Sequence, residues 1–225
     1  LPLLLEKKED IQVSQLEKPS LGSIGVKTDV NKIMGLDVWQ GLSAESIVEN
    51  LNYIPDIVTS KHLQFYLNNM YISSSNAPDG NSDQILKFVE TRLMKIKSSG
   101  QSKKLYQLVK QLPEGTRWEF WKKWLVEYEL FNHKDKAACK YINEKSKSNL
   151  DNFWQTTFIF CLSIEGKLNQ SEFIYDLIKS RGFADDVFEN LFQIIKMERK
   201  DFNLNNKKNK IKPFHIVMMD TLKIP

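Results

Sequence analysis

Large apolar residues recur in this chain at every thirty-fourth position. The positions are Leu86, Phe120, Trp154 and Phe188, and the same step relates Trp124, Phe158 and Phe192. Around them, segments of helical periodicity alternate with short polar breaks. Helix-turn-helix units that repeat every roughly 20 to 50 residues are typical of an α-solenoid. The pattern predicts an all-α fold, a right-handed α-solenoid of helix-turn-helix pairs whose period is 34, with these positions buried.

Composition shifts divide the chain into four parts. We expect an extended N-terminal arm over residues 1–42, a helical-repeat domain over 43–199, a Lys/Asn-rich linker over 200–212 and the start of a further helix over 213–225. Within the repeat domain, helices are expected over residues 43–54, 60–73, 82–98, 102–112, 116–131, 135–147, 150–165, 169–181 and 184–199.

Three polar patterns mark expected helix starts. Ser43 is placed as an N-cap, and Thr116–Glu119 and Asn169–Glu172 have the spacing of capping boxes. Asn169-Gln170-Ser171 also matches the acceptor pattern for N-glycosylation. We favour the capping role, because Glu172 supplies the second half of a box.

Positive charge is concentrated in the predicted linker. The formal net charge is +4, and the five lysines and one aspartate of residues 200–212 account for all of it. Nucleic-acid affinity comes largely from basic side chains that neutralise phosphates. A neutral body therefore argues against a nucleic-acid interface, and we favour a solvated connection over a tether to nucleic acid or anionic lipid.

The two cysteines, Cys139 and Cys161, lie on helices that we expect to be antiparallel neighbours. If the turn between them is centred near Ser148, the cysteines are offset by roughly 6 Å along the helix axis. A disulfide needs Cα atoms within about 7 Å in total. We therefore expect two buried free thiols rather than a disulfide.

The sequence contains no recognisable catalytic or metal-binding motif. His62, His133 and His215 are isolated and lack the spacing of metal ligands. No Gly-rich phosphate loop or nucleophile elbow occurs. The pair Asp185-Asp186 is placed at a helix start, where carboxylates complement the helix dipole. We expect no catalytic residue, no cofactor and no metal, and thus a protein that is not an enzyme.

One helix is crowded with aromatic residues. A platform that stacks bases or sugars is one interpretation. Five residues nevertheless share an arc of about 140°, the breadth of a helix packed between two neighbours; they are Phe120, Trp121, Trp124, Leu125 and Tyr128. We favour core packing for these, and Trp118, which lies off the arc, is the candidate for a surface contact.

The candidate contact residues lie mainly on the second helix of each pair, which is the more polar one. We expect a protein partner to contact Gln107, Lys140 and Tyr175, with Trp118 and Trp39 as further candidates. The basic linker would add long-range attraction to an acidic partner surface.

One repeat resembles a tetratricopeptide unit. With Tyr128 placed at the tyrosine of that family, Trp121 falls on its tryptophan and Tyr141 on the aromatic residue of its second helix, where Ala137 is the small residue. The unit is degenerate, because Leu125 replaces the family's glycine and Asn149 replaces its terminal proline.

A second resemblance concerns the location of the protein. The segments Gly35–Gly41, Phe153–Gln155 and Phe160-Cys161, with Gly166, resemble an uncharacterised group of exported bacterial helical-repeat proteins. That resemblance implies a periplasmic or otherwise exported protein, with the cytoplasm as the alternative. The start at Leu1 favours a processed or excised piece of a longer chain, and removal of a signal peptide stays open.

Three functions are compatible with these features. We favour a non-catalytic protein-interaction scaffold, since stacked helix pairs form an extended binding surface. The alternatives are an accessory helical domain of a larger cell-wall lytic enzyme and, less favoured, an RNA-binding helical repeat. No apolar run approaches the roughly 20 residues of a membrane span, so none is expected.

Overall fold

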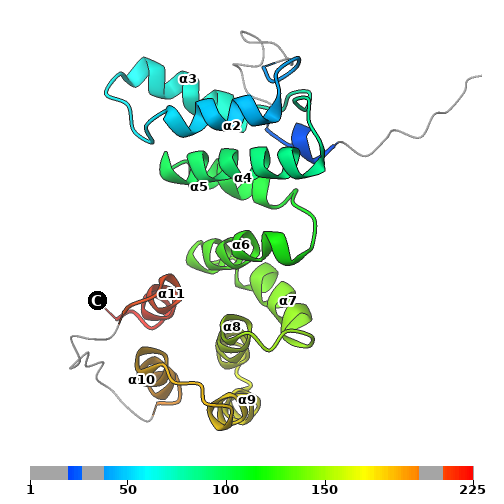
Figure 1. The fold of residues 1–225 in the computed structure, drawn as a ribbon. Coiled ribbons are helices and arrows are strands. Elements are labelled where there is room, and N and C mark those ends of the chain that lie inside the picture. Colours follow the sequence, from blue (N-terminus) through cyan, green and yellow to red (C-terminus); the bar gives the residue numbers. More distant parts are fainter. Residues whose placement is uncertain (1–19, 27–37, 198–209, 225) are drawn as a thin grey trace, which may run out of the picture. The chain divides into compact units, whose positions relative to one another are not determined.

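A computed structural model describes residues 20–26, 38–197 and 210–224. Within these ranges the chain is helical and has two isolated β-bridges but no β-strand, so the all-α prediction is confirmed (Figure 1). The chain divides into two compact units, Leu1–Gln111 and Leu112–Pro225. Most of the predicted arm and linker lies outside the described residues.

Among its described residues, the first unit has a turn of 3-10 helix followed by four α-helices. They are η1 (Leu21–Ser23), α2 (Ala44–Tyr53), α3 (Lys61–Ile72), α4 (Ser82–Ser98) and α5 (Ser102–Val109). The side chain of Ser43 accepts the amide hydrogen of Ser46, so the predicted N-cap is confirmed. Ser60 caps α3 in the same way, and Asn81 opens α4 with a capping box that was not predicted.

A buried charge holds the first unit together. The guanidinium of Arg92, on α4, donates hydrogen bonds to the carbonyl oxygens of Ile24 (3.1 Å), Tyr71 (3.0 Å) and Ser73 (2.9 Å). Burial lowers the pKa of Arg92 to about 10, which keeps it protonated at neutral pH. One side chain thus joins the segment 20–26 and the end of α3 to α4.

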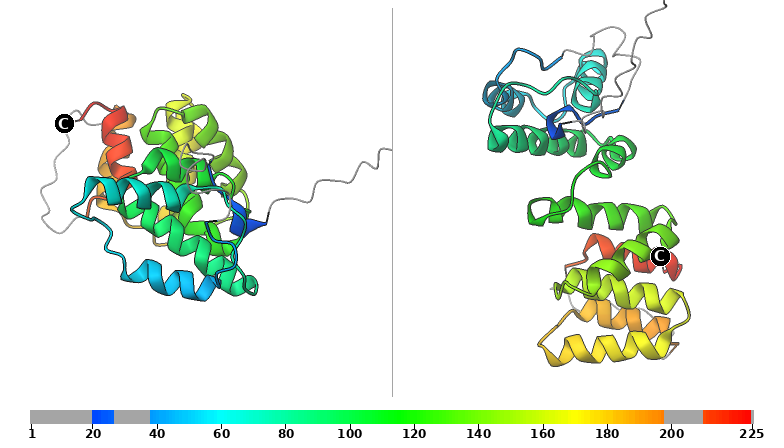
Figure 2. Two further views of the ribbon diagram at one scale, coloured as in Figure 1. Left: turned by 90° about the horizontal axis from the view of Figure 1, so that it is seen from above. Right: turned by 90° about the vertical axis from the view of Figure 1, so that its right-hand side faces the viewer.

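In residues 112–197 and 210–224, the second unit has one turn of 3-10 helix and six α-helices. They are η2 (Thr116–Trp118), α6 (Glu119–Phe131), α7 (Asp135–Ser146), α8 (Asn152–Ile164), α9 (Leu168–Ser180), α10 (Asp186–Ile195) and α11 (Pro213–Thr221). Helix α8 is central: it packs against α7, α9 and α10 (Figure 2). The core is correspondingly aromatic, with Trp154, Phe160 and Phe188 buried.

Neither predicted capping box forms. Residues Thr116–Trp118 make the 3-10 turn η2, and α6 starts after it without a side-chain cap. Helix α9 starts at Leu168, one residue before Asn169, also without a side-chain cap. The capping role of Asn169 is therefore wrong, and its side chain is exposed while Ser171 is buried.

The helix bounds repeat at an interval of 33 rather than 34. The first helices of three successive pairs end at residues 98, 131 and 164, and their second helices begin at residues 102, 135 and 168. Burial follows the same interval, because four side chains 33 apart are each at most 2% exposed: Phe88, Trp121, Trp154 and Val187.

The predicted set of equivalent buried positions is therefore wrong in part. Trp154 and Phe188 are buried, but Phe120 is 49% exposed and Leu86 is half-buried. One step along an α-helix turns a side chain by about 100°. An interval that is one residue too long therefore moves a position from the core face of one helix to the outer face of the next.

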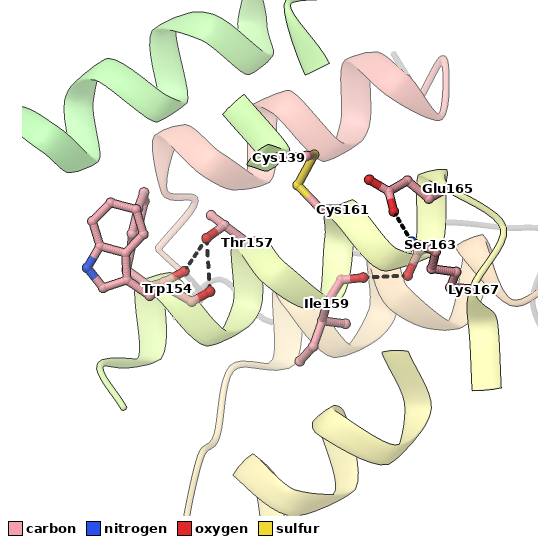
Figure 3. Close-up of a disulfide and its surroundings, with 9 residues drawn as sticks. Cys139, Trp154, Thr157, Ile159, Cys161, Ser163, Glu165 and Lys167 are labelled. Atoms are coloured by element: carbon pink, nitrogen blue, oxygen red, sulfur yellow. Dashed lines mark hydrogen bonds and ion pairs between the residues drawn. A yellow bond between two sulfur atoms is a disulfide. The ribbon is translucent and has the colours of Figure 1, made fainter. Parts of the chain in front are cut away.

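A disulfide joins Cys139 on α7 to Cys161 on α8, so the prediction of free thiols is wrong (Figure 3). The two Cα atoms are 5.5 Å apart. Cys139 lies about two helical turns before the end of α7 at Ser146, and Cys161 lies about two and a half turns after the start of α8 at Asn152. The axial offset is thus only roughly 3 Å, because the turn is centred one residue later than the sequence suggested.

Candidate protein-binding surfaces

The predicted contact residues on the second helices separate into two kinds. Gln107 on α5 and Lys140 on α7 are exposed, whereas Tyr175 on α9 is buried. The observed repeat interval leads from Gln107 to Lys140 and then to Phe173, not to Tyr175. Phe173 is 68% exposed, and it is the residue that occupies the outward position on α9.

Tyr175 is a core residue. Its ring lies 5.0 Å from the ring of Phe192 and 6.1 Å from that of Phe188. Burial, together with the nearby carboxylate of Glu189, raises the pKa of Tyr175 to about 12. Tyr175 therefore lies in the core and not on the surface, and its contact with a partner stays a prediction.

The two predicted tryptophan contacts are also buried. Trp118 ends the 3-10 helix η2 rather than lying on α6, so the α-helical wheel does not describe its direction, and its predicted surface position is wrong. Trp39 packs edge-on against Phe88, with ring centroids 5.3 Å apart, and lies beneath the guanidinium of Arg92. Both tryptophans are buried, so neither presents its ring on the surface.

The outer face of α6 is more open than the sequence predicted. Trp121 and Leu125 are buried as expected, but Phe120 is exposed and Trp124 and Tyr128 are half-buried. The rings of Trp124 and Tyr128 stack, with centroids 5.2 Å apart and an interplanar angle of 24°. Core packing therefore describes one face of α6 and not the whole aromatic arc.

Five of the exposed large apolar side chains of the first unit lie in a short stretch of sequence. We call this stretch the α3 surface; it comprises Tyr53, Ile57, Leu63, Phe65 and Tyr66. Tyr53 and Ile57, at the end of α2 and in the following loop, are 87% and 79% exposed. Leu63 and Tyr66 are three residues apart and share a face of α3. Leu67 and Ile72 of the same helix are buried.

A shallow apolar groove lies between α8 and α9 in the second unit. Its volume is about 320 Å³, and it is lined by Phe158, Leu162, Asn169, Gln170, Phe173 and Ile174. The exposed ring of Phe173 forms one wall. Phe173 occupies an outward position on the second helix of a pair, and the contact residues were predicted at positions of this kind. In this groove it forms part of a concave surface.

One buried acid–base pair is a candidate for chemistry. The Nδ1 atom of the buried His215 accepts the backbone N–H of Lys212 (3.2 Å), so the ring proton sits on Nε2 and points to Oδ2 of Asp185 (3.3 Å). Both ring nitrogens are thereby occupied. Asp185 in turn caps α10 through the amide of Phe188. The pair fixes the start of α10 to the start of α11 and leaves no free base.

The other candidate chemistries have no counterpart in the described part of the chain. Among those residues, no three His, Cys, Asp or Glu side chains are grouped so as to hold a metal ion. In the same residues no helix has both the length and the apolar character needed to cross a membrane.

No protein-family model matches the chain, and comparisons with curated proteins and with solved structures find no match.

Proposed function

We propose that this chain is a non-catalytic protein-interaction scaffold and that the α3 surface is its main contact site. The observation that carries the proposal is the concentration of large exposed apolar side chains between Tyr53 and Tyr66. Single exposed apolar residues are common on folded proteins, but clusters of them mark interaction sites. Tyr and Phe are also enriched among the residues that dominate binding energy at interfaces.

For the architecture, we propose a degenerate, tetratricopeptide-like α-solenoid with a right-handed superhelix whose period is 33. The common interval of the helix bounds and of the buried positions supports a repeat. In the second unit, α7 packs against α6 on one side and α8 on the other, and α8 packs against α9, as expected for stacked helix pairs.

For the location, we propose the periplasm or another exported compartment. The disulfide between Cys139 and Cys161 supports this location, because disulfides persist in oxidising compartments and are rare in the cytosol. Alkylation of the chain directly in its native cells tests the idea. An oxidised pair is expected, and two freely alkylated cysteines would place the protein in a reducing compartment.

The contact site is tested by removing apolar character from the α3 surface without touching the core. The variant Leu63→Ser/Phe65→Ser changes two exposed side chains, so its melting temperature should stay close to that of the unchanged protein. A photo-crosslinking residue at position 57 then reports partner capture in native extracts. We expect the double variant to reduce capture by about tenfold or more, which corresponds to loss of about 1.4 kcal/mol.

The matched control is Leu42→Ser/Met94→Ser. These side chains are 49% and 48% exposed and belong to the same unit, but they lie outside the α3 surface. Capture should survive this change. Equal capture by both double variants would show that the α3 surface does not bind the partner.

A further inference from the structure

Helix α11 occupies a site formed by three other helices of the second unit. It packs against α6 and α10 (Figures 1 and 2). The ring of Phe214 also contacts two aromatic residues of α8. We call this site the α11 seat. Unlike the other helices of the second unit, α11 is separated from the preceding helix by residues 196–212, so it is not part of a close helix pair.

The apolar contacts of α11 have the pattern of a helix bound in a groove. Phe214 is buried, and its ring centroid lies 5.5 Å from that of Phe160 and 6.4 Å from that of Phe188. Val217 and Met218, three and four residues later, are buried as well. Anchors at i, i+3 and i+4 are the signature by which grooves bind amphipathic helices.

Polar contacts occur at both ends of α11, and those at its start are the more buried. At its start, Lys212 forms an ion pair with Asp185, and His215 donates a hydrogen bond to the same carboxylate. Near its end, Oδ2 of Asp220 lies 3.7 Å from Nε2 of His133 on the loop after α6. These contacts set the direction of the bound helix, and none of them is covalent.

The fit between α11 and its seat is incomplete. A cavity of about 100 Å³ lies beside Phe214 and His215, and Asn152, Thr156 and Glu127 contribute to its walls. Side chains that line a void lose attractive contacts. A helix with a larger side chain at this point would therefore fill the seat better than α11 does.

The length of α11 also makes its position dependent on the seat. It has 9 residues, whereas isolated helices shorter than about 12 to 15 residues are marginal in water. The helical state of α11 is thus coupled to its binding in the seat. A short helix from another chain would depend on the seat in the same way.

We propose that the α11 seat is a binding site for a short amphipathic helix of a partner protein, and that α11 is its intramolecular competitor. The partner helix would carry a basic residue just before its first turn, an aromatic residue at its start and aliphatic residues three and four positions later. This inference rests on the proposed function as a protein-binding scaffold, but it concerns a surface other than the α3 surface.

Competition in the same chain lowers the apparent affinity for a partner in proportion to the fraction of open seats. If α11 occupies the seat in 99 of 100 molecules, affinity falls roughly a hundredfold. Weakening α11 should therefore strengthen binding in trans, because a larger fraction of the seats is then open.

The test uses the full chain and a fluorescent synthetic peptide with the sequence of residues 210–225. Peptide binding is measured by anisotropy with the unchanged chain and with the chain variant Phe214→Ala. The control is Ile216→Ala, which removes an exposed side chain from the same helix. We expect Phe214→Ala to bind the peptide about tenfold or more tightly than the other two chains, a gain of about 1.4 kcal/mol.

A second variant guards against loss of folding. Lys212→Ala removes the ion pair with Asp185 but no apolar anchor, and Lys210→Ala, another exposed lysine, is its control. Lys212→Ala should tighten peptide binding several-fold, with an unchanged circular dichroism spectrum. If folded Phe214→Ala and Lys212→Ala chains bind the peptide no better than the unchanged chain, the proposal is wrong.

Two further outcomes separate the alternatives. If the unchanged chain forms dimers that Phe214→Ala abolishes, the seat takes the α11 of a second copy, and a different partner protein is excluded as the occupant. Peptide binding should be the same in the Leu63→Ser/Phe65→Ser chain. Failure of the peptide experiment would thus overturn the α11 seat alone and leave the α3 surface to its own test.

Discussion

The two units hold their helix pairs together by different chemistry. In the first unit, the buried Arg92 bridges three backbone carbonyl groups through hydrogen bonds. In the second unit, residues 33 and 66 positions later are the apolar Leu125 and Phe158, and a disulfide between α7 and α8 supplies the cross-link.

The difference follows from what each unit has to connect. The first unit includes the segment 20–26, which is irregular apart from the 3-10 turn η1 and whose backbone groups need partners away from water. The amide of Val26 donates to the carbonyl of Ile72 (2.8 Å), and the carbonyl of Ile24 accepts from Arg92. Along this 33-residue interval Arg92 and Leu125 are buried and Phe158 is partly buried, while the chemistry of the position changes from charged to apolar.

The largest effect is expected when Arg92 is changed to Ala. Three buried carbonyl groups lose a donor, and each such loss costs about 1 to 3 kcal/mol. The first unit should therefore lose at least about 3 kcal/mol of stability. Hydrogen exchange measured by mass spectrometry should show faster exchange in the segment 20–26 and in α3.

Arg92→Lys provides the control, because it keeps the charge but not the planar array of donors. The stability of the Arg92→Lys chain should lie between that of the Arg92→Ala chain and that of the unchanged protein. An Arg92→Ala chain that exchanges as slowly as the unchanged one would mean that the guanidinium contributes no net stability.

The next effect concerns the disulfide. It closes a sequence separation of 22 residues, which limits the freedom of the unfolded chain. The double variant Cys139→Ala/Cys161→Ala should lower the free energy of unfolding of the second unit by about 3 kcal/mol. Urea unfolding with and without a reductant gives the matched comparison, and the variant should not respond to the reductant. Equal stability of the oxidised and reduced protein would contradict a stabilising cross-link.

A smaller effect depends on pH and on Asp185. Burial alone would raise the pKa of this carboxyl, but hydrogen bonds from His215, Lys212 and the Phe188 amide hold it well below its usual range. A folded pKa below the unfolded one stabilises the protein above about pH 4, and this stability is lost as the pH falls further.

The direction of this effect is checked by measuring the stability of the second unit as the pH is lowered. Between pH 6 and pH 3, approximately the range that spans the usual carboxyl pKa, the unchanged protein should lose more stability than Asp185→Asn, which cannot ionise. The two curves should converge at low pH. Parallel curves throughout would show that the Asp185 carboxylate is not a stabilising acceptor.

The smallest effect concerns the loop that follows the first helix of each pair. Gly100, His133 and Gly166 are 33 apart and have φ values of 73°, 54° and 76°. Positive φ suits glycine and strains other residues. His133→Gly should therefore raise stability by roughly 0.5 to 1 kcal/mol, since the exposed contact with Asp220 contributes little. A lower melting temperature would show that this contact outweighs the strain.

The sequence predicted the helices best where apolar spacing and turn signals agree. The helix at residues 82–98 has the predicted bounds, since Asn81 and Gly100 flank a regular apolar pattern. The predicted interval of 34 is one residue longer than the observed interval of 33. The cause is that Phe120 and Trp121 are adjacent and both aromatic. Burial distinguishes them, and burial depends on which helices are neighbours.

The candidate site was less predictable for the same reason. Trp39, Trp118 and Tyr175 combine apolar bodies with polar atoms, a character shared by core and interface residues. Only the packing of Trp39 and Tyr175 against Phe88 and Phe192 assigns them to the interior. The α3 surface shows the reverse case, in which large apolar side chains remain exposed.

The disulfide also has a mechanical consequence. Because it links the second helix of one pair to the first helix of the next, a force applied to the two chain ends cannot extend the stretch between the cysteines. At roughly 3.5 Å per residue, the fully stretched chain is shorter by roughly 70 Å while the bond is intact. In an optical trap, this hidden length would appear only after reduction, so the contour length of the pulled chain reports its redox state.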